Sequence, residues 1–262
     1  MSYSIFENGG YIGTEKSYGA NGVWTTHSQM PRRGGLIGAN SGTLTGIWNI
    51  RDLPSVSFAY LQTSSDNDNT AVTSKTFSAV NFGADIANRY VIITLGVFRQ
   101  AALSSITIGG ETATMIGSEA NADGASEFYS IWYAQPSGTS GDIVVTLASS
   151  ATLQLAISTY RFISNDIATS QFGASSNNSG GTTAISLTAV GPGSLILWSG
   201  GNANQSAGTP TFTNITGVQD DVRDVRSNEW MNACSGTADA AGSAQISHNG
   251  SEGAVMALWD LP

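Results

Sequence analysis

Carboxylate and amide side chains gather in two short stretches of the sequence, and such groups could bind a metal ion. The carboxylates are Asp66 and Asp68 in the first stretch and Asp220, Asp221 and Asp224 in the second. Ca²⁺ prefers oxygen ligands of this kind, but neither stretch has the spacing of a helix–loop–helix calcium site. Asp and Asn are also ordinary turn residues, and we favour that interpretation. We therefore predict no cofactor, with calcium as the metal these loops would suit best.

Histidine and cysteine are too scarce for the commoner catalytic sites. His27 and His248 are the only histidines, and Cys234 is the only cysteine. A structural zinc site needs several of these residues close together. A serine hydrolase needs a histidine held by a carboxylate and a serine on a tight turn, and no Gly-x-Ser-x-Gly motif occurs. We interpret both histidines as surface or turn residues and Cys234 as a small buried apolar residue.

Paired carboxylates could instead hydrolyse a glycosidic bond. The candidates are Glu111, Glu119, Glu127, Glu229 and Glu252. All are expected at strand ends or in loops, and none lies in an aromatic cluster of the local sequence. Trp132 and Tyr133 could stack on a sugar, but we expect their strand to face the core. The sequence therefore favours a protein that is not an enzyme.

The charge balance narrows the class of partner. The 262 residues include 10 Lys and Arg against 19 Asp and Glu, a net charge of −9. Binding to nucleic acid or to an anionic membrane surface requires a cationic face, so we expect neither. No apolar run approaches the roughly 20 residues of a membrane-spanning helix, and the N-terminus does not read as a signal peptide. One cysteine allows no intrachain disulfide, so we expect stabilisation by oligomerisation.

The residues from Glu127 to Phe162 show the β pattern most clearly. Three strands are expected there, and we place the second turn at Ser149 and Ser150. Tyr90–Val97 is apolar on both faces, as expected of a central strand. No segment predicts a convincing α-helix. The charged run Val222–Arg226 is expected to be exposed, either as a solvated loop or as a patch that forms salt bridges between subunits.

The order of these segments occurs twice in the chain. Residues 163–262 repeat the order of residues 55–162, so that Glu229–Cys234 corresponds to Glu127–Trp132. Many short strands joined by tight turns indicate a β-sandwich or jelly roll. We therefore predict an all-β fold, a jelly-roll-like β-sandwich with two similar halves. The pattern leaves open whether the halves form one sandwich or two stacked sandwiches.

Residues 1–54 differ in texture from the β region, residues 55–262. Glycine is dense, and two short motifs place a β-branched residue and a tryptophan after glycine, ending at Trp24 and Trp48. Aromatic side chains offer large contact areas. We predict an extended N-terminal arm that orders when its tryptophans pack on a neighbouring subunit, with a flexible leader as the alternative.

The second motif resembles a known element. Gly46-Ile47-Trp48-Asn49-Ile50-Arg51-Asp52 is similar to the SG-(I/V)-W-(S/N)-(L/I)-R-D element near the N-terminus of many tailed-phage virion proteins, chiefly tail-fibre and head-fibre subunits. The resemblance implies that the arm docks on the virion or on other subunits. Its candidate docking residues are Trp24, Trp48, Arg51 and Asp52. The family has no catalytic residues to carry over.

The β region resembles a jelly-roll-like domain of phage fibre proteins and some bacterial surface proteins. The matching segments are Trp132-Tyr133, Pro136–Thr139, Val144–Thr146 and Ala156–Tyr160. Together the two resemblances imply a structural protein located in the virion, foremost a tail-fibre or receptor-binding subunit. Its expected partners are itself, as a homotrimer, other virion proteins and a host-surface glycan. A capsid-decoration or head-fibre protein and a non-catalytic carbohydrate-binding β-sandwich are the alternatives.

Overall fold

The chain divides after Pro54 into two units, residues 1–54 and 55–262. The computed structural model describes residues 4–5, 11–12, 57–68, 70–98, 102–120, 127–152, 154–164, 167, 171–177, 181–202, 208–226 and 229–260. In the first unit it describes one short antiparallel pair, β1 (Ser4–Ile5) and β2 (Tyr11–Ile12). The second unit holds all the other described strands.

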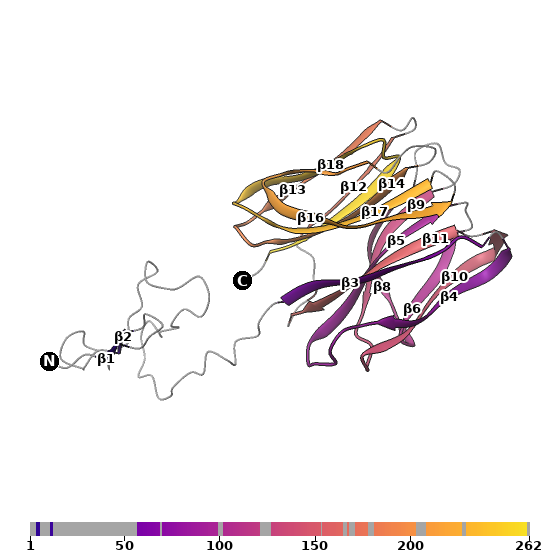
Figure 1. The fold of residues 1–262 in the computed structure, drawn as a ribbon, viewed down its shortest axis with the longest axis horizontal. Coiled ribbons are helices and arrows are strands. Elements are labelled where there is room, and N and C mark those ends of the chain that lie inside the picture. Colours follow the sequence, from indigo (N-terminus) through magenta and orange to yellow (C-terminus); the bar gives the residue numbers. More distant parts are fainter. Residues whose placement is uncertain are drawn as a thin grey trace. The chain divides into compact units, whose positions relative to one another are not determined.

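The first half of the second unit is a sandwich of two antiparallel sheets (Figure 1). One sheet has the strand order β3-β11-β5-β9-β8 and the other β4-β10-β6-β7. The strands are β3 (Ser57–Asp66), β4 (Ala71–Asn81), β5 (Arg89–Phe98), β6 (Leu103–Ile108), β7 (Glu111–Thr112), β8 (Thr114–Ala120), β9 (Glu127–Ala134), β10 (Ser140–Thr152) and β11 (Gln154–Ile163).

The second half is another antiparallel sandwich, drawn in orange and yellow in Figure 1. Its larger sheet has the order β12-β19-β14-β17-β16 and its smaller sheet β13-β18-β15. The strands are β12 (Gln171–Ser176), β13 (Thr182–Ala189), β14 (Leu195–Asn202), β15 (Thr211–Thr213), β16 (Ile215–Arg226), β17 (Glu229–Ala238), β18 (Gly242–Asn249) and β19 (Gly253–Trp259).

Both halves have the same strand order. In the larger sheets, β12, β19, β14, β17 and β16 take the places of β3, β11, β5, β9 and β8. In the smaller sheets, β13, β18 and β15 take the places of β4, β10 and β6. The prediction of an all-β fold is therefore confirmed, and the two similar halves form two sandwiches rather than one.

Three apolar cores separate the four sheets. Strand β5 shows how, because its residues alternate between two of these cores. Val91, Ile93 and Leu95 belong to the core inside the first sandwich, whereas Ile92 and Phe98 belong to a second core shared by the two halves. A third core lies inside the second sandwich. The central strands of both five-stranded sheets are thus buried on both faces, and the prediction of a central strand at Tyr90–Val97 is confirmed.

The two five-stranded sheets pack with an approximate twofold relation. Most of the contacting strands form matched pairs. Strand β3 contacts β16 as β12 contacts β8, β11 contacts β16 as β19 contacts β8, and β5 contacts β17 as β14 contacts β9. The contact of β19 with β9 is a departure from this symmetry. Strands β5 and β14, which are equivalent, contact each other. Such reciprocal pairing is the pattern of a symmetric dimer interface. Here both partners belong to one chain.

Two glycines at equivalent positions make this packing close. Gly96 lies opposite Tyr129 in the first half, and Gly201 lies opposite Met231 in the second. A Cβ on Gly201 would lie 2.5 Å from the Tyr129 hydroxyl, and a Cβ on Gly96 would lie 2.9 Å from the Met231 sulfur. Each half therefore places a large side chain over the glycine of the other half.

Two local expectations are wrong. Ser149 and Ser150 do not form a turn but lie inside β10, where the pairing with β4 shifts register between Thr146 and Ala151. An irregularity in the pairing accommodates these polar residues without ending the strand.

Val222–Arg226 is not a loop but the end of β16, an edge strand that pairs with β17 on one side only. Across the described part of the chain, no helix is long and apolar enough to cross a membrane.

The glycine contacts predict unequal effects of the same substitution. We expect Gly201→Ala to destabilise the protein by about 1 to 3 kcal/mol through overpacking, because its Cβ would also meet the Trp230 carbonyl oxygen. We expect Gly96→Ala to cost less, because the Met231 thioether can move aside. Urea denaturation at equilibrium measures both effects.

Gly191→Ala is the matched control, because a Cβ there would meet no atom within 4 Å. Its unfolding free energy should stay within about 0.5 kcal/mol of the wild type. Equal stabilities for Gly201→Ala and Gly191→Ala would show that the close approach of the two halves contributes nothing.

Candidate functional site

The residues expected to dock the arm lie outside the part of the chain that the structure describes. They are Trp24, Trp48, Arg51 and Asp52. His27 lies outside it as well. The candidate sites that can be built from side chains therefore lie in the second unit.

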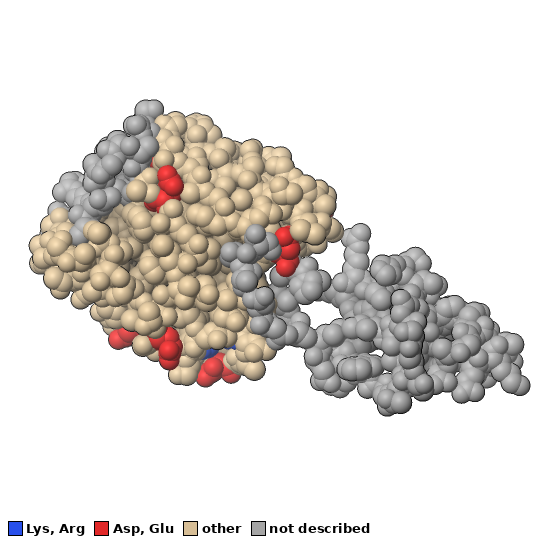
Figure 2. All heavy atoms as spheres, turned by 180° about the vertical axis from the view of Figure 1, so that it is seen from behind, with Lys and Arg blue, Asp and Glu red and all other residues tan. Residues whose placement is uncertain are grey.

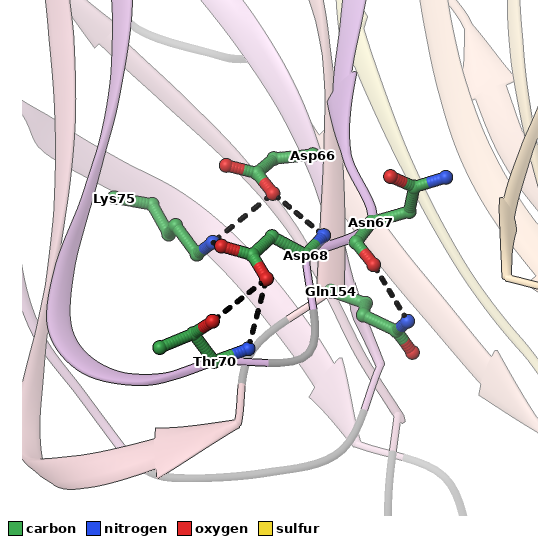
Figure 3. A network of polar contacts seen from close by, with 6 residues as sticks. All are labelled: Asp66, Asn67, Asp68, Thr70, Lys75 and Gln154. Carbon is green, nitrogen blue, oxygen red and sulfur yellow. Dashed lines mark hydrogen bonds and ion pairs between the residues drawn. The ribbon is translucent and has the colours of Figure 1, made fainter.

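The first acidic stretch faces a lysine of the protein itself (Figure 3). Asp66 ends β3 and Asp68 follows it, while Lys75 reaches toward them from β4. The Lys75 Nζ lies 3.0 Å from Asp66 Oδ1 and 3.8 Å from Asp68 Oδ2. The lysine side chain is only 7% exposed, so its ammonium group is held between the sheets with these carboxylates as counter-charges. The cation that these carboxylates meet is Lys75.

Hydrogen bonds hold several other polar groups of this loop. Asp68 Oδ1 accepts hydrogen bonds from the Thr70 backbone N–H and hydroxyl, at 3.1 and 2.8 Å. These bonds hold the pKa of Asp68 below its usual value. Gln154 of β11 donates to the Asn67 carbonyl at 3.1 Å and anchors the loop to the sheet. No group of three or more His, Cys, Asp or Glu suited to a metal ion occurs among the described residues.

A β-bulge separates the side chain of Asp220 from those of Asp221 and Asp224 in the second acidic stretch. Pairing between β16 and β17 passes from Gln219–Cys234 to Asp221–Ala233, which leaves Asp220 without a partner across the ladder. A bulge re-aims the extra side chain. Asp220 turns toward the first sandwich, whereas Asp221 pairs with Arg223 at 2.6 Å and Asp224 is exposed. The structure thus does not bring the three carboxylates together.

Asp220 meets hydroxyl groups from both sandwiches. The Tyr160 hydroxyl, from β11 of the first half, donates to Asp220 Oδ2 at 3.1 Å. The Ser235 hydroxyl, from β17 of the second half, donates to Asp220 Oδ1 at 3.0 Å. Cys234 lies beside them, buried and free, as the sequence predicted. We call the region around Asp220, Tyr160 and Ser235, where β3 and β11 meet β16 and β17, the polar seam.

Burial sets the electrostatics of the polar seam. It raises the pKa of Asp220 to about 6, although the hydrogen bonds from Ser235 and Tyr160 act in the opposite direction. Burial also raises the pKa of the Tyr160 hydroxyl and of the Cys234 thiol. A carboxyl group that titrates near neutral pH between packed elements marks a candidate functional site. Its available chemistry is the gain and loss of one proton, since none of the described imidazoles lies beside Ser235 to complete a serine relay.

His248 is not a surface residue, contrary to the sequence interpretation. It is fully buried in β18, with its ring 5.7 Å from that of Trp198. Its Nε2 lies 3.3 Å from Asn232 Nδ2, and Asn232 Oδ1 accepts a bond from Gln219 at 2.5 Å. Burial lowers the pKa of His248, so the ring is neutral at physiological pH. The sequence interpretation relied on the Asn249-Gly250 turn that follows His248. The alternation of β18 places His248 on the same buried face as Ile246 and would have predicted its burial.

The carboxylates considered for glycoside hydrolysis are scattered. Glu111 is exposed on β7, Glu119 lies on β8 and Glu252 precedes β19. The side chains of Glu127 and Glu229 lie outside the described part. Trp132 packs on the first core and Tyr133 on the second, so the expectation that their strand faces the core is confirmed.

Comparisons with protein-family models, with curated proteins and with solved structures find no match. Function is therefore inferred from the residues and their geometry.

Because Lys75 faces the first acidic loop, we predict that calcium does not change the thermal stability of the protein. We expect the melting temperature of the wild type to be the same in millimolar calcium and in chelator, because Lys75 already faces both carboxylates. Lys75→Met should lower the melting temperature, because Asp66 and Asp68 would then repel each other without a counter-charge. Calorimetry measures both results. Lys16→Met, at the only other lysine, lies in the first unit and should leave the transition of the second unit unchanged.

His248 predicts a loss of stability on acidification. Its pKa is lowered in the folded protein from 6.5, so its contribution is present above that pH and is lost as the pH falls through the folded value. His248→Gln should therefore show a smaller loss of unfolding free energy than the wild type between about pH 7.5 and pH 5. Denaturant titrations across this range test it. His27→Gln should keep the wild-type profile; a flattened profile in that variant instead would contradict the assignment.

Proposed function

We propose that this chain is a structural subunit of a tailed-phage virion, foremost a tail-fibre or receptor-binding subunit. Residues 1–54 attach it to the particle or to neighbouring subunits, and residues 55–262 project from the particle. The observation that carries the proposal is the resemblance of Gly46–Asp52 to an N-terminal virion element, in a chain whose other unit is built from β-strands in its described part.

The construction of the β unit supports a role outside a cell. The central strands of the two five-stranded sheets are buried on both faces, and three apolar cores hold the layers together. The single cysteine is buried and unpaired, so this stability owes nothing to disulfides. A projecting virion domain needs stability of this kind, and we propose that each sandwich is jelly-roll-like.

The surface of the β unit supports a role in contact rather than in chemistry. Figure 2 shows a face on which acidic side chains stand in a few isolated places and the rest of the described surface is almost all uncharged. Three of the four outward positions of β13 bear hydroxyl groups, at Thr182, Ser186 and Thr188. Hydroxyl groups donate and accept hydrogen bonds, as the hydroxyls of sugars do. A host-surface glycan is therefore the receptor class that we propose.

Aromatic stacking has no support from the described side chains. A carbohydrate-binding sandwich is expected to expose aromatic rings, and each described aromatic side chain is buried or half-buried. The proposed glycan contact would therefore rest on hydrogen bonding by hydroxyl and amide groups.

Immunogold labelling of the parent particle tests the proposal. We expect an antibody against residues 55–262 to label the tail tip in electron micrographs. Label over the capsid would assign the chain to head fibres or capsid decoration. Particles without any label would contradict the virion role.

The arm is tested in the same system by deletion of residues 1–54. We expect the shortened chain to lose threefold association and attachment to particles, and Trp24→Ala with Trp48→Ala to weaken both. The melting transition of residues 55–262 should persist, which is the control for folding. If the full chain is already a monomer that binds a defined glycan, the carbohydrate-binding alternative replaces the virion arm.

A further inference from the structure

The indole N–H of Trp198 is a buried hydrogen-bond donor in the second sandwich. Buried tryptophans usually give this hydrogen to an acceptor. Trp132 donates it to Ser130 Oγ at 2.8 Å, and Trp259 donates it to the Ile167 carbonyl oxygen at 3.0 Å. The Trp198 side chain is fully buried, and its Nε1 has no acceptor among the described residues. A donor that is buried without a partner loses the hydrogen bond it makes with water in the unfolded chain.

Two further polar atoms without a partner belong to neighbours of this ring. His248 is fully buried, and its ring centroid lies 5.7 Å from that of Trp198. Thr183 is 1% exposed and lies opposite His248 in the ladder between β13 and β18. His248 Nδ1 and Thr183 Oγ1 are both buried, and neither has a hydrogen-bond partner in the described part of the chain. His248 therefore adjoins both of the other residues.

Gly200 places the N–H edge of Trp198 on the side of His248. A Cβ on Gly200 would lie 2.7 Å from Trp198 Cζ2, an atom on the edge of the indole that carries Nε1. Gly200 lies opposite Asn232 in the ladder between β14 and β17. The Asn232 Nδ2 atom lies 3.3 Å from His248 Nε2. The indole edge, the amide and the imidazole therefore meet in one place inside the sandwich.

The equivalent strand of the first half has only apolar side chains at its fully buried positions. In β10 these positions hold Ile143, Val145 and Leu147. In β18 they hold Ala244, Ile246 and His248. The shared fold thus does not require a polar side chain on the inner face of this strand. The group of polar atoms around His248 belongs to the second half alone.

The chemistry of the three atoms fits water better than an ion. An indole N–H only donates, a hydroxyl group donates and accepts, and each nitrogen of a neutral imidazole does one or the other. Water both donates and accepts, so it suits such a mixed set. An ion would lose its hydration here to neutral groups alone. Buried water typically makes about three hydrogen bonds to buried polar groups that have no other partner.

We propose that the second sandwich encloses one structural water molecule, which accepts a hydrogen bond from Trp198 Nε1 and also binds Thr183 Oγ1 and His248 Nδ1. Thr183 and His248 belong to the smaller sheet of this sandwich, and Trp198 belongs to the larger sheet. The water therefore ties the two sheets together at a point where the first sandwich relies on apolar packing.

Nuclear Overhauser measurements between water and the full-length protein test this site. The protein carries ¹⁵N in its tryptophans and histidines. We expect a cross-peak between water and the Trp198 indole N–H, with the sign that marks a long-lived contact. The indole N–H of Trp259 is the matched control, because it is buried and already donates to Ile167, and it should show no such peak. Absence of the Trp198 cross-peak, or an equal one at Trp259, would overturn the proposal.

Substitution of Thr183 tests whether its hydroxyl group holds the water. Thr183→Val keeps the shape of the side chain and removes the hydroxyl, so we expect the Trp198 cross-peak to be lost. Thr183→Ser retains the hydroxyl and should retain the cross-peak, and so should Thr182→Val at the exposed neighbouring position. A cross-peak that survives unchanged in Thr183→Val would contradict the proposed site. The comparison of Trp198 with Trp259 in the wild type decides the question if Thr183→Val does not fold.

Discussion

Burial of both faces of the central strands in the two five-stranded sheets is the constraint on which the rest of the structure depends. Each smaller sheet covers one face of its larger partner, and the remaining faces can leave water only against each other. The hydrophobic effect therefore joins the two halves through the same force that folds each of them. This explains the near-continuous apolar sequence of β5 and of the first half of β14, and the strictly alternating burial of β13, which has one face exposed to solvent.

Approximate symmetry follows from joining two copies of one topology by one face. Tyr129 over Gly201 and Met231 over Gly96 are the same contact made twice. Thr94 and Ser199, at equivalent positions of β5 and β14, are both buried with hydroxyl oxygens that have no partner. The hydroxyls on these strands mirror each other, and the bulges of β8 and β16 do so as well. Against this background the departures from symmetry stand out, and the clearest is that the bulge of β16 carries Asp220 where the bulge of β8 carries Ile116.

Strand β16 separates two titratable groups, the buried His248 and the partly buried Asp220, whose pKa values shift in opposite directions. Gln219 points into the second sandwich, toward Asn232 and His248, and its neighbour Asp220 points toward the first sandwich. Burial favours the neutral form of both titratable groups, which raises the pKa of the acid and lowers that of the base. Their contributions to stability therefore change in opposite directions with pH.

The sequence by itself determined the all-β class, the repeated strand order, the doubly buried central strand and the burial of Cys234, because alternation and turn residues are local properties of the chain. It also placed every carboxylate of the second acidic stretch in a loop, since short-range composition cannot separate an edge strand from a turn. Only the tertiary structure decided that Lys75 neutralises Asp66, that His248 is in the core, and that Asp220 meets Tyr160 across the two halves. These contacts join residues from different strands, and the face on which each side chain lies depends on registers, bulges and sheet stacking that no short segment contains.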